Sequence, residues 1–329
     1  MKNNLLTVNV ITYNHKPYIA KCLDSLLEQE TDFGFIIRVF DDCSTDGTTE
    51  ICREYAEKHP NKIFFYPTEK NLGVIENPIR AYSNIETPYY MLIEGDDYSC
   101  GQGRFQRQVK ILEEHPECSF CAAKTMTNFV HGESRNEDFP VLQIGIYSLE
   151  EVLKSTAKWG QFNTHTGSRI VRTKCIILDK KHPQCFLGDI TQEIELLRQG
   201  SMYFVDECFC VYNLTGTGIW SGKTTFKKIG YLLKNLEEYD EYTNYEYHKL
   251  LISIFKHHSG FDLFLDEPQL QVHHNVPHNV PHNVSHNVPH TRQCKRIKNF
   301  IKLFIPPILL KIIHLPRDVI RFIKSRRKQ

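Results

Sequence analysis

Pairs of acidic residues stand at the ends of two apolar, strand-like segments of this chain. Asp41 and Asp42 follow one segment, and Asp96 and Asp97 follow the other in the run MLIEGDDY. Acidic residues at the carboxyl ends of parallel strands gather in one crevice, which is where open α/β sheets bind ligands. Chemistry that needs several carboxylates therefore has a natural place in this chain, and we expect the active site there.

The elements that would position these pairs alternate between strand and helix. Apolar periodicity predicts strands over residues 7–11, 35–40, 63–66 and 89–93, and helices over residues 17–29, 48–58, 76–84 and 104–114. Repeated alternation of this kind predicts an α/β fold, with a mostly parallel sheet, helices on both faces and right-handed crossovers.

Five short motifs occur in the order found in family 2 glycosyltransferases. They are VNVITYN (residues 8–14), VFDDCSTDG (39–47), NLG (71–73), EGDD (94–97) and GD (188–189). The chain therefore resembles a nucleotide-sugar-dependent glycosyltransferase over about residues 5–225. The resemblance implies a GT-A, Rossmann-like sheet and inverting transfer of a sugar to a cell-surface glycan.

The resemblance also implies how the donor would be bound. A departing diphosphate needs a divalent cation, Mn²⁺ or Mg²⁺, which prefers carboxylate oxygens. Asp97 matches the metal ligand, and Asp96 matches a ribose contact or second metal contact. Asp42 matches the residue that reads the base edge and Tyr13 an aromatic that stacks on the base, which favours a UDP-sugar. From the residues alone, Asp41, Asp42 and Asp46 are equally Asx-turn caps.

Catalysis and acceptor binding are expected further along the chain. Asp189 matches the family's general base at the start of a helix, although the same position suits an N-cap aspartate. His165 and Trp159 are candidates for the acceptor pocket. Trp220 would stack on a sugar or close over the nucleotide, with a packed aromatic as the alternative. Acidic residues 193 and 195, next to Asp189, are predicted to be surface charges of the helix.

Several positions depart from the family's pattern. Glu94 replaces the usual Asp, Asn213 and Thr215 stand where relatives often have Arg and His, and SCGQG (residues 99–103) replaces a Trp-Thr-Asp-Pro sequence. An impaired scaffold that kept the fold is therefore an alternative function. A sugar nucleotidyltransferase is a second one, but ITYNHKPY lacks the basic, glycine-rich phosphate loop that this activity needs.

Four parts are expected along the 329 residues, a length that can bury a sizeable core. Residues 1–225 form the glycosyltransferase domain, with a nucleotide-sugar-binding half (1–115) and an acceptor half (116–225). Residues 226–270 form a helical extension, and 271–291 a His-Asn-Val-Pro repeat. Proline at every fourth position favours an extended linker there over a metal site. Residues 292–329 form a tail.

This tail is basic and amphipathic. It carries twelve of the chain's 40 Lys and Arg residues and one of its 39 acidic residues, and its longest uncharged run has eight residues, far short of the roughly 20 that cross a bilayer. We expect it to lie on an anionic membrane surface. Packing on the rest of the chain, which has 38 acidic and 28 basic residues, is the alternative. Nucleic-acid binding is disfavoured because few aromatic groups are available for stacking.

The expected location follows from the tail and the amino terminus. The first residues lack the long apolar region and cleavage site of a signal peptide, and the eleven cysteines are scattered without zinc-ribbon spacing. We therefore expect a cytoplasmic protein that is peripheral on the inner face of the cytoplasmic membrane. Its partners would be a nucleotide-sugar donor and a glycan or lipid-linked acceptor.

Overall fold

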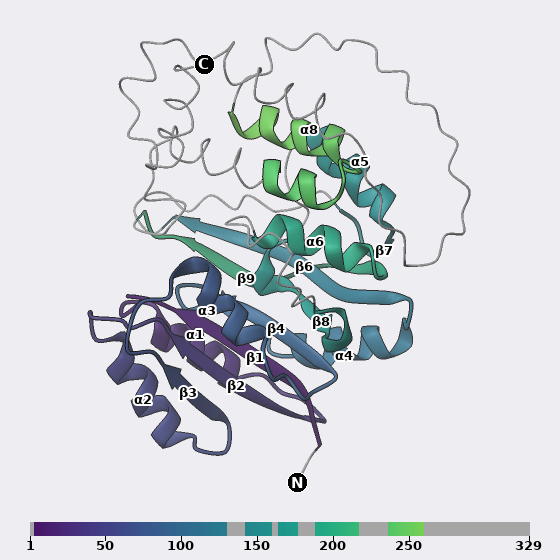
Figure 1. Cartoon of the computed structure of the whole chain (residues 1–329). Helices are drawn as coiled ribbons and strands as arrows, with labels where there is room; N and C mark the ends of the chain where they lie inside the picture. The colour runs from purple at the N-terminus through teal and green to yellow at the C-terminus, as the bar shows by residue number, and fades with distance from the viewer. Residues whose placement is uncertain (1–2, 130–141, 160–163, 177–187, 217–235, 260–329) are drawn as a thin grey trace, which may run out of the picture. The chain divides into compact units, whose positions relative to one another are not determined.

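The computed structural model describes residues 3–129, 142–159, 164–176, 188–216 and 236–259 (Figure 1). All of them belong to one compact unit, Met1–Gly260. The predicted linker and tail, and the predicted boundaries at residues 225, 270 and 291, lie outside the described residues. Within these ranges, no helix combines the length and the apolar character that a membrane span requires.

The amino-terminal part alternates strand and helix, as predicted. Its elements are β1 (Asn4–Thr12), α1 (Ile19–Leu27), β2 (Gly34–Asp41), α2 (Thr48–Lys58), β3 (Ile63–Pro67), α3 (Gly73–Tyr82) and β4 (Tyr89–Glu94). The strands lie in the order β3-β2-β1-β4, and every neighbouring pair is parallel (Figure 1). The carboxyl ends of these strands therefore meet at one edge of the sheet.

The second part continues the same sheet with longer and less regular connections. Its elements are β5 (Tyr98–Ser99), α4 (Arg104–Glu114), β6 (Cys118–Phe129), β7 (Gly145–Tyr147), α5 (Leu149–Trp159), the 3₁₀ turns η1 (Thr166–Ser168) and η2 (Thr173–Cys175), β8 (Ile170–Arg172), α6 (Gly188–Leu197), β9 (Ser201–Leu214) and α8 (His248–Ser259). Beyond β4 the order is β8-β6-β9-β5, and β7 pairs with β9. The long β6–β9 ladder is parallel, whereas the pairings of β8, β5 and β7 are short and antiparallel.

Strand β4 shows how the sheet buries both of its faces. Tyr89, Met91 and Ile93 belong to a core cluster that α1, α2 and α4 complete, whereas Tyr90 and Leu92 belong to clusters on the opposite face with α5, α6 and α3. Successive strand residues point to opposite faces, so a strand buried on both sides reads as one apolar run. The predicted α/β fold with helices on both faces is confirmed.

A helical extension packs on the second part of the unit. Residues 236–242 are helical and precede α8. Leu236, Tyr239 and Leu251 of this region form an apolar cluster with Ile194 of α6. The predicted C-terminal helical extension is therefore present, and it covers the side of α6 that faces away from the sheet cluster.

Candidate active site

Both acidic segments are hydrogen-bonded to the end of β1. The Asp42 N–H donates to Thr12 O at 2.9 Å, and the Gly95 N–H donates to Ile11 O at 2.8 Å. Strand β1 pairs with β2 on one side and β4 on the other. The pairs Asp41-Asp42 and Asp96-Asp97 therefore lie at one sheet edge, where parallel strands bring ligand-binding residues together.

Gly95 sets the shape of the turn that carries Asp96 and Asp97. A Cβ atom at this position would lie 2.7 Å from Thr12 Oγ1 and 2.9 Å from Thr12 Cβ, so only glycine fits against β1. The Asp97 N–H donates to Glu94 O at 3.0 Å and closes the turn. The sequence EGDD thus forms a tight turn that ends β4 and carries three acidic side chains.

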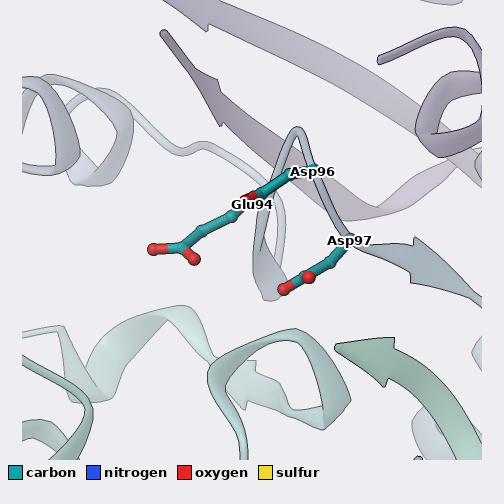
Figure 2. A group of neighbouring side chains, drawn as sticks. All are labelled: Glu94, Asp96 and Asp97. Atoms are coloured by element: carbon teal, nitrogen blue, oxygen red, sulfur yellow. The ribbon is translucent and has the colours of Figure 1, made fainter. Parts of the chain in front are cut away.

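Glu94, Asp96 and Asp97 form a carboxylate cluster on this turn (Figure 2). One oxygen from each of the three lies within 4.8 Å of the others, a grouping that can hold a metal ion. Asp96 and Asp97 are buried, whereas Glu94 is exposed. Oxygen ligands with one solvent-facing member suit Mg²⁺ or Mn²⁺, which keeps several of its waters.

Asp96 carries a buried carboxylate oxygen that a cation would neutralise. Its Oδ1 atom is buried and has no hydrogen-bond partner among the described residues, and its Oδ2 atom lies 3.7 Å from His15 Nε2. A buried charged oxygen without a donor is costly unless something neutralises it. Burial lowers the pKa of His15 below its ordinary value, against the raising effect of Asp96, so His15 does not supply the opposite charge that Asp96 lacks. The surroundings of Asp96 therefore fit a bound cation.

Asp97 is held by strand β9 and by the turn η1. Its Oδ1 atom accepts the backbone N–H of Asn213 at 2.9 Å, and its Oδ2 atom lies 3.7 Å from His165 Nε2. The Asn213 side chain donates to Asp96 O at 2.6 Å and accepts from Asn128 at 2.8 Å. Asn213, a departure from the family's pattern, thus anchors the acidic turn in this chain.

The carboxylate of Asp42 accepts two backbone N–H groups at the start of α3. Leu72 N lies 2.7 Å from Oδ1 and Gly73 N lies 2.8 Å from Oδ2, while the Asn71 side chain donates to Asp42 O. The NLG motif therefore serves to bind this aspartate, and an anion at a helix N-terminus is favourable. A base contact by Asp42 would use its remaining lone pairs. Tyr13, at 44% exposure, presents its ring near the same edge.

The two other aspartates of this segment make local hydrogen bonds within the loop, in line with the Asx-turn alternative. Asp41 is fully buried, and its carboxylate accepts from the hydroxyls of Ser44 and Thr49. Asp46 accepts from Thr48 N at 3.0 Å. The small polar residues between β2 and α2 thus hold the loop in place by local hydrogen bonds.

The remaining candidates fall partly outside the described residues. Asp189 lies in the first turn of α6. The structure does not describe its side chain, the side chain of Trp159 or any part of Trp220. The roles of these three residues stay predictions. His165 lies next to Asp97, and its predicted place in the acceptor pocket stays a prediction.

The prediction that residues 193 and 195 are surface charges is wrong. Glu193 is fully buried and pairs with Arg169 at 2.6 Å, and Glu195 is 6% exposed and accepts from the Tyr239 hydroxyl at 2.8 Å. The reason is tertiary, because Arg169 of the segment that leads into β8 pairs with Glu193, and Tyr239 of the helical extension contacts Glu195. Two glutamates two residues apart gave no local signal of this burial.

Sequence reasoning also missed two residues of the site. His15 follows β1 and reaches Asp96, and Asn213 lies near the end of β9 and holds the acidic turn. His15 had a usable signal, because it stands in the first strand-to-helix loop at the edge where the acids gather. The family pattern marked the position of Asn213, but not its contact with the acidic turn, because that contact depends on the pairing of β9 with β5 and β6.

Comparison with known proteins agrees with this architecture. The family model described as glycosyl transferase family 2 matches residues 7–175. TuaG of Bacillus subtilis (strain 168), a putative teichuronic acid biosynthesis glycosyltransferase, is 25% identical over 243 residues, which are 70% of this chain and 88% of TuaG. Three uncharacterised mycobacterial proteins are 33% identical over 137 residues, which are 42% of this chain. The match covers 39% of the length of these relatives.

Solved structures share the fold. S. aureus TarS (residues 1–349) in complex with UDP-GlcNAc has a TM-score of 0.56 at 22% identity, over 79% of this chain and 73% of that chain. The mannosyltransferase PcManGT from Pyrobaculum calidifontis, in complex with GDP-Man and Mn²⁺, has a TM-score of 0.54 at 16% identity, over 77% and 70%. The fold of the described unit is therefore the GT-A fold.

Proposed function

This chain belongs to glycosyl transferase family 2, and on that premise we propose that it transfers a sugar from a nucleotide diphosphate donor to an acceptor hydroxyl. The observation that carries the proposal is the carboxylate cluster of Glu94, Asp96 and Asp97 at the sheet edge. One of its buried oxygens, Asp96 Oδ1, has no donor among the described residues. A cluster of this kind suits a donor whose diphosphate is bound through a cation.

Within this proposal, Asp96 and Asp97 would hold the divalent cation, with Glu94 as a solvent-exposed third contact. When bound, the cation supplies Lewis-acid stabilisation of the negative charge that develops on the departing diphosphate. The turn itself is held by Gly95 against β1 and by Asn213 of β9. The protein therefore orients the acids before the donor arrives, which favours catalysis.

A uridine nucleotide is the donor base that the residues favour. Tyr13 presents an exposed ring at the carboxyl end of β1, and Asp42 lies beside it at the end of β2. An aromatic ring can stack on a base, and a carboxylate can accept from the N–H of uracil. A solved structure with the same fold, TarS, contains UDP-GlcNAc, which supports a UDP-sugar donor here.

Inversion at the anomeric carbon would need a base on the acceptor hydroxyl, opposite the leaving group. Asp189 is our candidate for this role. It stands in the first turn of α6, the helix that also carries the buried Glu193. A buried, ion-paired helix is a rigid support for such a residue, and rigid placement is what general-base catalysis requires.

We further propose that the acceptor is a growing, lipid-linked cell-surface glycan at the inner face of the cytoplasmic membrane. The basic amphipathic residues 292–329 would bind the anionic leaflet. This binding would confine the enzyme to the plane of its acceptor and raise their effective concentration. The similarity to TuaG, named for teichuronic acid biosynthesis, supports a polymeric cell-surface acceptor.

A panel of nucleotide sugars tests the proposed donor. With Mn²⁺ present and a ligand at 100 times its dissociation constant, binding is expected to stabilise the protein by about 2.7 kcal/mol. We expect UDP-sugars to raise the thermal midpoint, GDP-sugars to raise it less, and EDTA to abolish the shift.

Turnover separates the proposed function from its alternatives. The release of UDP from the stabilising donor is expected to depend on Mn²⁺. UDP-sugar binding without any turnover would indicate an impaired scaffold. Formation of a nucleotide sugar from a nucleoside triphosphate would indicate a nucleotidyltransferase. Stabilisation by no nucleotide sugar at all would contradict the proposal.

Deletion of residues 291–329 tests the membrane role. The full-length chain is expected to sediment with vesicles that contain anionic lipid, and the truncated chain is expected to stay in the supernatant. Each Lys or Arg near the surface contributes about 1 kcal/mol, so high salt should also release the full-length chain. Vesicles of neutral lipid are the control. Equal sedimentation of both chains would show that the tail does not anchor the protein.

A further inference from the structure

We propose that His165 is a positioning residue for Asp97. Its ring donates the Nε2 proton to Asp97 Oδ2, and His165 does not bind the cation itself. The inference rests on the proposed function, because it assumes that Asp97 belongs to a cation site. It assigns His165 a role different from the predicted one, which was to line the acceptor pocket. Three features of the surroundings of His165 support this role.

The first feature is the hydrogen bond that fixes the tautomer of the ring. The Gly167 N–H donates to His165 Nδ1, with an N–N distance of 3.2 Å. A backbone N–H can only donate, so Nδ1 must have its lone pair free for this bond. The neutral ring then carries its proton on Nε2. Cys210 Sγ, 3.8 Å from Nδ1, offers a second donor to the same atom.

The second feature is the close packing that fixes the orientation of the ring. His165 caps the turn η1, and the ring of Tyr212 lies 4.8 Å from its own, centroid to centroid. A Cβ atom at Gly167 would lie 2.8 Å from Cys210 Sγ and 3.3 Å from His165 Nδ1, so glycine is required for this approach. The orientation of the His165 ring is therefore fixed by three contacts: its own turn, the residues of β9 and the neighbouring glycine.

The third feature is the position of Nε2 relative to Asp97. Nε2 lies 3.7 Å from Asp97 Oδ2, and the side chain of Asp97 is fully buried. The other oxygen, Oδ1, accepts the Asn213 N–H. Contacts of this length lie beyond the roughly 3.2 Å limit of good hydrogen bonds, and such contacts commonly shorten in the substrate complex. His165 and β9 thus hold Asp97 from two sides.

The tautomer separates a positioning role from a ligand role. A histidine that binds a metal donates its other ring N–H to a carboxylate, a carbonyl or a water. His165 does the opposite, because Nδ1 accepts from Gly167. In this state Nε2 has a proton to donate and no lone pair for a metal. Each carboxylate oxygen has two lone pairs, so one carboxylate can accept from a histidine and bind a cation at the same time.

Two substitutions of His165 test the roles of Nδ1 and Nε2 separately. His165→Asn keeps an acceptor near Nδ1 for the Gly167 N–H but removes the donor toward Asp97. His165→Gln places an amide N–H near Nε2 but removes the acceptor for Gly167. Mn²⁺ binding to the full chain in the presence of UDP is measured by the electron paramagnetic resonance signal of free Mn²⁺. His59→Gln, at the end of α2, is the control for histidine loss elsewhere.

We expect Mn²⁺ affinity to follow the contact with Asp97. His165→Asn should weaken it 10–100-fold, the typical cost of losing a group that orients a metal ligand, with a thermal midpoint close to that of the wild type. His165→Gln should recover most of the affinity, and His59→Gln should leave it unchanged. A merely structural role of His165 predicts the reverse order of the Asn and Gln variants.

Three results would overturn the inference, and they can be told apart from failure of the proposed function. Wild-type affinity in His165→Asn would exclude the positioning role and leave the proposed function standing. A ¹⁴N coupling from a directly coordinated imidazole, lost in His165→Gln, would make His165 a ligand. No Mn²⁺ binding by the wild-type chain would overturn the inference together with the cation site of the proposed function.

Discussion

Replacing Asp96 by Asn is expected to lower kcat/KM for sugar transfer at least about 100-fold, in the range found when one group that stabilises developing charge is removed. The change keeps the size of the side chain but removes the negative charge. Asp96 Oδ1 is buried without a donor among the described residues, so a bound cation would neutralise its charge. Steady-state rates with the donor identified by thermal stabilisation, at several Mn²⁺ concentrations, measure the effect.

The stability of the folded protein should not fall in Asp96→Asn, although its activity does. The uncompensated carboxylate oxygen is costly in the absence of a cation, and neutral Asn lowers that cost. We therefore expect Asp96→Asn to unfold at the same or a higher urea concentration than the wild type when EDTA is present. Asp206→Asn is the matched control, since this exposed aspartate pairs with Lys124 away from the acidic turn. Full activity in Asp96→Asn would contradict the proposed cation site.

Truncating Glu193 to Ala is expected to lower the free energy of unfolding by about 3–5 kcal/mol, the cost of leaving one charge of a buried pair alone. Glu193 and Arg169 are 0% and 1% exposed, and Arg169 Nη2 lies 2.6 Å from Glu193 Oε2. Arg169 also donates to Thr164 O at 2.6 Å and to Thr164 Oγ1 at 2.8 Å. The pair therefore joins α6 to the segment that leads from Thr164 through η1 to β8. Urea unfolding measures the loss.

A double variant tests whether the loss comes from the unpaired charge. Glu193→Leu combined with Arg169→Met removes both charges and keeps apolar volume, so it should recover most of the lost stability. Glu150→Ala is the control, because the exposed pair of Glu150 and Lys154 is worth about 0–1 kcal/mol. A double variant as unstable as Glu193→Ala alone would assign the loss to packing.

The alternation of strands and helices in the first hundred residues could be predicted because it follows from the spacing of apolar residues within each segment. Strand β4 is an apolar run since both of its faces are buried, and α1 repeats apolar residues at helical spacing. The position of Asp96 and Asp97 followed from the same logic, because a turn after a parallel strand must lie at the carboxyl edge of the sheet. The GD at the start of α6 likewise marked the beginning of a helix.

The surroundings of the acidic residues could not be predicted in this way. The NLG motif was recognised as a pattern, but only the structure shows that Leu72 and Gly73 bind the carboxylate of Asp42. The burial of Glu193 depends on Arg169, 24 residues before it, and that of Glu195 on Tyr239, 44 residues after it. Side chains on a helix surface look alike in the sequence whether water or another helix covers them.

The sequence by itself determined the order of the elements, the two acidic turns and the basic character of the tail, because periodicity, turn chemistry and charge are local properties. The tertiary structure alone decided which residues surround each acid. His165 and Asn213 reach Asp97 from positions 68 and 116 residues further along the chain. Strand β9 brings Asn213 there by pairing with β5 and β6. Long-range strand pairing is chosen by the packing of the whole sheet, and no local spacing records it.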